Sequence, residues 1–391
     1  MPSESVSQNA AAPAATADGT FSADLYRVLS ADAADTVFSP VSVAAALRMA
    51  LCGARGQTAA ELGRALHHDG TPRAAADGLR SLSAAVANVT AGGSVTFRAP
   101  NTIWVQAGLP LLPDFTARLS EAAAAAWAEA DFTAAPAAAR AEINQVIAGQ
   151  TEGKITDLLP PDAIGERTKL VLASAVYLKA AWLEPFAESA TADAPFYPDG
   201  RDQPSLTVPM MHGTGSREYL RGDGYQAVLL GYRGASLVMA VVLPDGPLAA
   251  LPPRIGTAGL AGLLAGATSH QVTLSMPRFR VEAAFDLVPV LQRLGVREAF
   301  GDHADFSGIT EAQPLKVGAV AHQAYVDVGE HGTEAAAATA VTMLRTSAVL
   351  RRPAAVTMVV DRPFLFAIMD TATGLPLFLG QVSHPSRPPE S

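Results

Sequence analysis

The sequence predicts an α+β fold built as one large domain, on three observations. Helical patterns dominate residues 21–160, whereas strand patterns dominate from residue 169 onward. Elements segregated in this way, rather than alternating, are typical of α+β architecture. Residues 21–383 contain no internal repeat and no linker rich in Pro, Gly or Ser, and apolar residues make up 49% of the chain, so one sizeable core can form.

The helical part has one well-marked start, at Ser39 and Pro40. Ser39 is a good N-cap, and Pro40 fits the first turn of a helix. Apolar residues recur at helical spacing up to Leu51, and Gly53 is expected to end the helix. Further helices are expected at residues 58–67, in the alanine-rich stretch 119–130, and at 138–150, with Pro136 separating the last two; residues 94–106 carry a strand pattern.

The later part of the chain is rich in strand signals. A continuous apolar run at residues 169–178 is typical of a strand buried on both faces. Residues 236–243 and 271–276 have the same pattern, and residues 316–328 alternate. Additional strands are expected at residues 356–369 and 377–382, with a short helix at 286–294.

The two ends of the chain are expected to be unstructured. Residues 1–20 should form a disordered N-terminal arm, and residues 384–391, with three prolines, a flexible C-terminal tail. The first residues have neither the basic start nor the apolar stretch of a signal peptide, which favours a cytoplasmic location. No apolar window is long enough for a membrane-spanning helix.

Charge and composition exclude several functions. Lys and Arg number 28 against 37 Asp and Glu, which gives a net charge of −9, so nucleic acid and membranes are not expected partners. The single cysteine, Cys52, precludes an internal disulfide, and its apolar neighbours in the sequence indicate a buried, inert thiol, with a reactive thiol as the alternative.

No motif for catalysis or for metal or cofactor binding emerges. None of the eight histidines has metal-ligand spacing with a carboxylate or thiol, and there is no G-x-S-x-G sequence. Residues 149–154 resemble a phosphate-binding loop, but they are one residue short, and Ile155 stands where Ser or Thr should hold magnesium. We therefore expect no catalytic residues, no metal and no cofactor, and the chain is not expected to be an enzyme.

The most unusual segment, residues 330–347, follows an alternating strand and contains four consecutive alanines between polar residues. In an extended strand, alternate side chains from Thr333 to Met343 would be small and then apolar on one face. Such a strand can slide into a packed sheet without introducing charge or bulk. Gly332 supplies a hinge that tolerates unusual φ and ψ. The pattern suits a segment that changes from loop to strand; a flexible linker or a short alanine helix is the alternative.

Motifs along most of the chain resemble the serpin family. Residues 330–339 (EHGTEAAAAT) are similar to the hinge of inhibitory serpins, residues 358–368 (MVVDRPFLFAI) to their C-terminal signature, and residues 38–58 to their helix B and the segment after it. Shorter motifs recur in family order: Asn101-x-x-Trp104, Ile143-Asn144, Thr151-x-Gly-Lys-Ile155, residues 175–182, residues 208–211, Leu243-Pro-Asp245, residues 276–279 and Leu294-Gly295. On these motifs, residues 20–383 are identified as a serpin.

The resemblance implies a serpin fold with three β-sheets, eight to nine helices and an exposed reactive-centre loop at about residues 330–352. It also implies the family mechanism, in which a serine protease cuts the loop as a suicide substrate and forms an acyl-enzyme. The cut loop then inserts into the five-stranded sheet A, a known form of strand addition. The trapped protease is carried along and distorted, and the intact fold is metastable.

The resemblance also implies three groups of site residues. The hinge comprises Glu330, Gly332, Thr333, Glu334, Ala335, Ala336, Ala337 and Ala338. The shutter, a polar cluster where sheet A must part, comprises Ser39, Ser42, Ser174 and His322. Ser174 stands where most serpins have asparagine, so this cluster is expected to be smaller or filled by water. In the breach, at the top of the sheet, Trp182 is expected to pack and Glu330 to pair with Arg278.

The scissile bond is expected at Thr346–Ser347, counted from Glu330, with Arg345–Thr346 as the alternative. A small β-branched residue such as Thr346 favours elastase-like or subtilisin-like enzymes, whereas cleavage after Arg345 would make trypsin-like enzymes the targets. The molecule is expected to act as a monomer. The alternative function is that of a non-inhibitory serpin, a binding or chaperone-like protein, although such members tend to carry proline or charge in the hinge. The alternative location is extracellular, where many relatives act.

Overall fold

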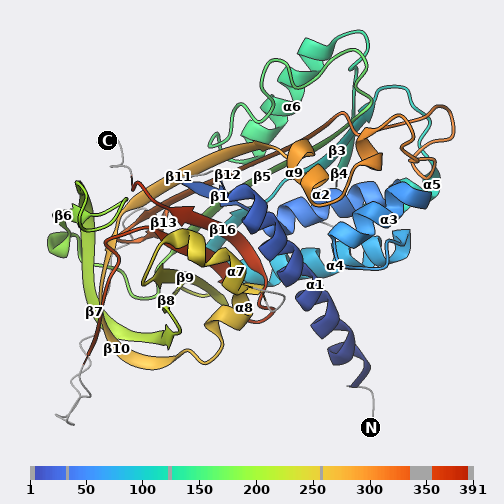
Figure 1. The fold of residues 1–391 in the computed structure, drawn as a ribbon. Coiled ribbons are helices and arrows are strands. Elements are labelled where there is room, and N and C mark those ends of the chain that lie inside the picture. Colours follow the sequence, from blue (N-terminus) through green and yellow to red (C-terminus); the bar gives the residue numbers. More distant parts are fainter. Residues whose placement is uncertain (1–4, 32–34, 122–125, 256–258, 335–354, 386–391) are drawn as a thin grey trace.

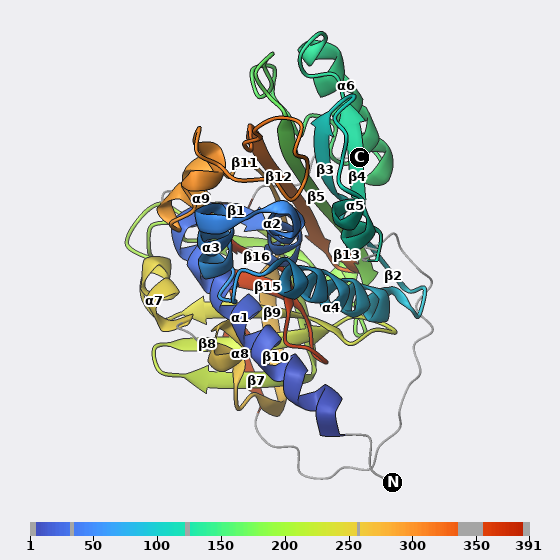
Figure 2. The same cartoon turned by 90° about the vertical axis from the view of Figure 1, so that its right-hand side faces the viewer.

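Helices α2 to α5 gather on one side of the strands β5 (Leu170–Ala181) and β12 (Ala319–Gly329), and α6 lies alone on the other (Figures 1 and 2). The computed structural model describes residues 5–31, 35–121, 126–255, 259–334 and 355–385. Within these ranges the helices are α1 (Ser5–Leu29), α2 (Pro40–Gly53), α3 (Gly56–Ala65), α4 (Pro72–Thr90), α5 (Pro113–Ser120), α6 (Pro136–Gln150), α7 (Pro252–Ile255), α8 (Gly259–Leu264) and α9 (Val288–Arg293). Among the helices described, none combines the length and apolarity that a bilayer span requires.

Helix α2 forms where the local signals predict it. The Ser39 Oγ accepts a hydrogen bond from the backbone N–H of Ser42, and Pro40 occupies the first turn. The helix ends at Gly53, where an added Cβ would lie 2.2 Å from the Ile309 side chain. Every residue of α2 is buried, so this helix lies at the centre of the core.

Several elements differ from the sequence prediction. The alanine-rich stretch expected to be a helix contains strand β4 (Ala126–Ala130), because parallel pairing with β3 (Asn101–Gln106) overrides the helix propensity of alanine. Pro136 begins helix α6 instead of separating two helices. Helix α1 begins at Ser5, within the segment expected to be a disordered arm; alanine, the strongest helix former, is frequent there.

The single strand expected at residues 356–369 is two strands. Strand β14 (Val356–Val359) pairs with β10 (Thr268–Pro277), whereas β15 (Phe364–Asp370) pairs with β9 (Leu237–Pro244) and β16 (Pro376–Val382). Pro363 precedes β15 and has no N–H to donate to a ladder, so the chain breaks its pairing there.

One of the two hydrogen-bonded sheets, sheet A, has the strand order β11-β12-β13-β5-β3-β4, and β2 pairs with β5. Its strands are β2 (Val95–Arg98), β3, β4, β5 (Leu170–Ala181), β11 (Phe279–Asp286), β12 (Ala319–Gly329) and the two-residue β13 (Gly332–Thr333). Strand β5 corresponds to the continuous apolar run. Nearly all of its residues are buried, so the strand is covered on both faces.

The second sheet joins two parts through its longest strand, β7. One end of β7 pairs with β6 and the other with β8, while β10 pairs along the middle. By hydrogen bonding the strands thus form two sheets where three were expected, because β7 runs unbroken from one part into the other. The strands of the second sheet are β1 (Thr36–Phe38), β6 (Ala192–Phe196), β7 (Leu206–Gly222), β8 (Tyr225–Gly231), β9, β10, β14, β15 and β16.

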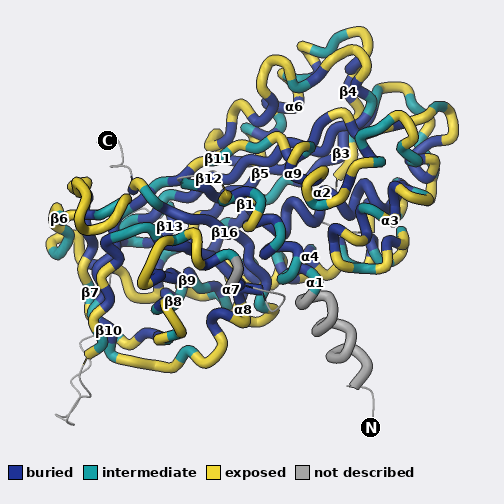
Figure 3. Tube along the Cα trace, viewed as in Figure 1, coloured by how far each residue is buried: buried dark blue, intermediate teal, exposed yellow. Residues whose placement is uncertain are grey.

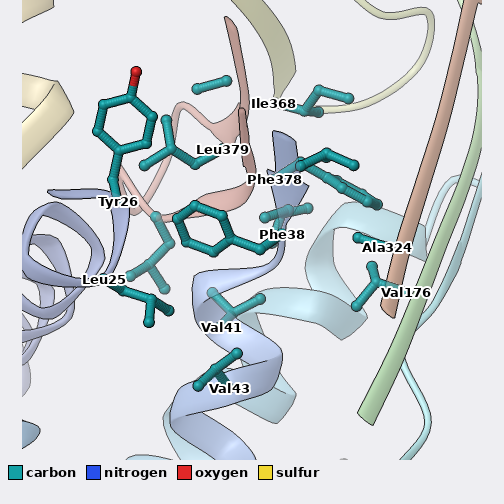
Figure 4. Close-up of a cluster of buried hydrophobic side chains, with 14 of the residues drawn as sticks. Leu25, Tyr26, Phe38, Val41, Val43, Val176, Ala324, Ile368, Phe378 and Leu379 are labelled. Atoms are coloured by element: carbon teal, nitrogen blue, oxygen red, sulfur yellow. The ribbon is translucent and has the colours of Figure 1, made fainter. Parts of the chain in front are cut away.

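Two hydrophobic cores lie on opposite faces of sheet A. The larger core contains Val176 of β5 and Ala324 of β12, which face Phe38 at the end of β1 and Val41 in the first turn of α2 (Figure 4). The smaller core lies between sheet A and α6, and includes Ala173 of β5. Buried strands thus lie beneath the exposed surface of α6 (Figure 3). Alternate residues of β5 and β12 therefore face α2 and α6 in turn.

Candidate functional site

The two central strands of sheet A, β5 and β12, are parallel neighbours. They pair directly from Val171 opposite Ala319 to Tyr177 opposite Tyr325. We call this line of direct pairing the seam. No hydrogen-bonded strand separates β5 from β12 along the seam, although 147 residues of sequence separate Ser174 from Ala321 where they touch.

Above the seam, the chain turns back after β12 and enters the sheet. Thr333 of β13 pairs antiparallel with Val328 of β12 on one side and with Ala180 of β5 on the other. Strand β13 is therefore a short antiparallel wedge between two parallel strands. The sheet is already parted at this end by two residues of the segment that the sequence predicts to be a hinge.

Gly332 permits the close approach that the wedge requires. Its φ is +147°, and a Cβ at this position would lie 2.1 Å from the carbonyl oxygen of Ala180. A side chain would therefore collide with the backbone of β5. Glu334, the next residue after β13, has a φ of +48°, in the left-handed region that non-glycine residues seldom occupy.

Glu330 ties the turn before the wedge to neighbouring strands. Its carboxylate accepts hydrogen bonds from Arg278 Nε at 2.7 Å and Thr191 Oγ1 at 2.5 Å, and it is almost fully buried. Burial by itself would raise the pKa of Glu330, but the hydrogen bonds from Arg278 and Thr191 outweigh it and lower that pKa. Glu330 is thus held ionised against Arg278.

Trp182 and Tyr232 support the wedge from the core side. The Trp182 indole N–H donates to the Gly329 carbonyl at 2.9 Å, and its ring stacks on Tyr232 with 4.5 Å between ring centroids. The Tyr232 hydroxyl lies 2.6 Å from Thr333 Oγ1. Burial raises the pKa of Tyr232, so its hydroxyl stays protonated. Sequence reasoning missed Tyr232, because no local motif marks it.

The shutter residues meet across the seam. The backbone N–H of Ser39 donates to His322 Nε2 at 2.9 Å, so the ring proton lies on Nδ1, which is 2.8 Å from Ser174 Oγ. The Ser174 hydroxyl in turn donates to the Ala321 carbonyl at 3.4 Å. His322 is fully buried, and burial lowers its pKa to about 3, so the imidazole is neutral.

Two polar groups around this cluster remain unpaired. Within the described part of the chain, neither Ser42 Oγ nor Asn101 Oδ1 has a hydrogen-bond partner, although both atoms are buried. Asn101 lies opposite Ser174 in the pairing of β3 with β5. Ser174 itself bonds His322 directly.

A second group of side chains faces α6 at the wedge end of the seam. The Tyr177 and Tyr325 side chains are both buried, and Lys154, in the turn after α6, forms an ion pair with Glu334. The Lys154 ammonium lies 5.7 Å from the centroid of the Tyr325 ring. The Thr151–Ile155 motif contains Lys154, but its spacing gives no sign of a partner at Glu334.

The remaining predicted residues lie outside the described part of the chain. These are the later hinge residues Ala335, Ala336, Ala337 and Ala338, and the expected reactive-bond residues Arg345, Thr346 and Ser347.

Comparisons with known proteins agree with this geometry. A family model described as "Serpin (serine protease inhibitor)" matches residues 16–385. An uncharacterized serpin-like protein of Thermococcus kodakarensis is 36% identical, over 95% of this chain and 86% of that one. The leukocyte elastase inhibitor of Sus scrofa is 35% identical, over 94% of this chain and 98% of the inhibitor. The crystal structure of Serpin48 of the insect Tenebrio molitor superposes with a TM-score of 0.84 at 26% identity, covering 98% of this chain and 100% of that one.

Proposed function

Because this chain belongs to the serpin family and has the serpin fold, we propose that it inhibits a serine protease as a suicide substrate. Its similarity to a leukocyte elastase inhibitor supports protease inhibition. The observation that carries the proposal is the wedge, an antiparallel β13 already seated between parallel β5 and β12. A strand that continued β13 would separate these two strands along the whole seam.

The register of the wedge supports a full insertion. Thr333 lies opposite Ala180, and each further residue of an antiparallel strand moves one residue back along β5. Met343 would then lie opposite Leu170, the first residue of β5, and Thr346 would lie three residues beyond it. A protease attached to Thr346 would thus be carried past the far end of β5, whose 12 residues span roughly 40 Å.

Insertion is favourable because it exchanges one parallel pairing for two antiparallel ones. Parallel pairing is slightly less stable per residue, and each new backbone hydrogen bond contributes about 1 kcal/mol net. The alternation of side chains along the loop also suits the two faces of sheet A. Thr333 faces Tyr232 on the core side, so odd-numbered loop residues would face the core and even-numbered ones, which include Ala336, Ala338 and Ala340, would face α6.

The chemistry of the trap belongs to the protease. Its serine Oγ attacks the carbonyl carbon of Thr346, and the amine of Ser347 leaves with a proton, which yields an acyl-enzyme. Hydrolysis of that ester would free the protease. Insertion of the cut loop before hydrolysis moves the protease across the inhibitor and distorts it, so the ester persists.

Thr346 favours elastase-like or subtilisin-like targets, and the elastase inhibitor relative supports this preference. Cleavage after Arg345 would instead select trypsin-like enzymes. The test is incubation of the full chain with an elastase, subtilisin and trypsin, followed by a denaturing gel and mass spectrometry. A detergent-stable complex, with release of residues 347–391, is the expected result. Cleavage by all three enzymes without a stable complex would overturn inhibition and favour a binding or chaperone-like role.

A further inference from the structure

The last closed rung of the seam is a pair of tyrosines. Tyr177 of β5 lies opposite Tyr325 of β12, and both residues are buried on the face of sheet A toward α6. Three residues farther along each strand, at Ala180 and Val328, the wedge already separates the strands. Further opening of the sheet must therefore begin by separating Tyr177 from Tyr325.

An ion pair between Lys154 and Glu334 lies beside this pair of tyrosines and stabilises the closed arrangement of the two strands. The Lys154 ammonium pairs with the Glu334 carboxylate and lies 5.7 Å from the Tyr325 ring centroid. Burial raises the pKa of the Tyr177 hydroxyl, and the nearby Glu334 carboxylate raises it further. The ion pair thus lies beside both tyrosines. Arg280, whose guanidinium carbon is 4.8 Å from the ring centroid, is a second cation at Tyr325.

Glu334 is also the next residue that must join the inserted strand. Its left-handed φ of +48° ends β13, and its N–H donates to the Asp327 carbonyl at 2.8 Å. To extend the strand, Glu334 must change to an extended conformation, which moves its carboxylate away from Lys154. The ion pair therefore stabilises a strained conformation that blocks insertion.

Backbone hydrogen bonds fix the turn that carries Lys154. It follows α6 in a tight turn, in which the Lys154 N–H donates to the Thr151 carbonyl at 3.0 Å and the Gly153 N–H to the Ala148 carbonyl at 2.8 Å. The Lys154 side chain is 38% exposed, so its replacement leaves no buried cavity. Lys154 thus belongs to the turn after α6, whereas Glu334 belongs to the hinge.

We propose that Lys154, through its contacts with Glu334 and the Tyr177–Tyr325 rung, is a positioning residue that sets how fast sheet A opens. The proposal rests on the proposed function, because it assumes that sheet A accepts an additional strand. Insertion moves β5 and β12 apart by about one strand spacing, roughly 4.8 Å, so one lysine cannot keep both contacts while the strands part. Loss of Lys154 should therefore speed opening.

The test measures strand uptake without a protease. Full-length protein is incubated with a labelled synthetic peptide of residues 335–345, and uptake is followed by native gel and by the rise in melting temperature. Lys154→Ala should take up the peptide at least about fivefold faster than the wild type. Lys154→Arg, which keeps the charge, should stay near the wild-type rate. Lys316→Ala is the matched control, since it removes a lysine that pairs with Asp302 beyond the other end of the seam.

A double variant gives the second readout. If Lys154 acts through Glu334, Lys154→Ala combined with Glu334→Gln should be no faster than Lys154→Ala alone. Equal uptake rates in Lys154→Ala and the wild type, or equal acceleration by Lys316→Ala, would overturn the role of Lys154 and leave the proposed function standing. Absence of uptake by every variant would overturn both, because the sheet would not open at all.

Discussion

His322 on β12 lies directly opposite Ser174 on β5, and its Nδ1 is 2.8 Å from the serine Oγ. This hydrogen bond crosses the seam between the two strands that must separate if the chain inserts its loop. The imidazole also accepts the N–H of Ser39, at the start of α2, so the same ring links the sheet to the core helix.

The buried state of His322 predicts a pH dependence of stability. Its pKa is about 3 in the folded protein, below the ordinary value of 6.5, so on acidification the unfolded chain binds the proton first. His322 should thus reduce the free energy of unfolding by about 1.4 kcal/mol per pH unit between about pH 6 and pH 3. Denaturant titrations of the wild type and His322→Gln at pH 7, 5 and 4 would measure this. The stability difference between the two proteins should change with pH; a constant difference would contradict the prediction.

Glu330→Ala should loosen the turn before the wedge and promote polymerisation. The substitution leaves Arg278 without its carboxylate partner, which should lower the free energy of unfolding by about 2 kcal/mol. Laddering on native gels after mild heating would report polymers. Glu121→Ala is the control, because it removes an exposed glutamate that pairs with Arg80. An unchanged monomer band for Glu330→Ala would count against the role of this pair.

Gly332→Ala should convert an inhibitor into a substrate. The new methyl group would meet the Ala180 carbonyl at 2.1 Å, so the wedge could not seat and insertion would be slow. The protease should then be released after cleavage, and the fraction trapped should fall by at least about tenfold. Gly329→Ala, in the same turn, is the matched control, since nothing lies within 4 Å of its added Cβ. Equal trapping by the two variants would exclude this account of Gly332.

Cleavage of the loop should make the molecule more stable to heat. Roughly ten new backbone hydrogen bonds, less the entropy of ordering the strand, should raise the melting temperature by at least about 10 °C. Circular dichroism of intact and nicked protein would show the difference. A nicked molecule that melts at the temperature of the intact one would rule out insertion.

Local signals predicted the elements whose structure is determined locally. Ser39 and Pro40 begin α2 because a cap and a first-turn proline act within a few residues. The apolar run of β5 shows its burial on both faces directly. Strand β4 was predicted wrongly because its state depends on pairing with β3, from Thr102 to Gln106, which no local propensity records.

Residues of the candidate site could be predicted from the sequence only where they belong to a recognisable motif. Family resemblance pointed to His322, Ser174 and Glu330, but Tyr232 and the partnership of Lys154 with Glu334 arise only when distant segments meet. Lys154 and Glu334 are 180 positions apart in the sequence, and the residues around either one do not indicate that the other is its partner. Such a contact depends on how the chain folds and cannot be predicted from a local sequence pattern.

The unpaired polar atoms beside the seam make the closed form of sheet A less stable than this fold would allow. Ser42 Oγ and Asn101 Oδ1 are buried without partners in the part of the chain described, so the closed arrangement is locally frustrated where it would have to open if the loop inserts. Ser42→Ala would remove an unsatisfied hydroxyl and should relieve that conflict. Selection for inhibition would therefore oppose the very substitutions that a designer of rigid proteins would choose first.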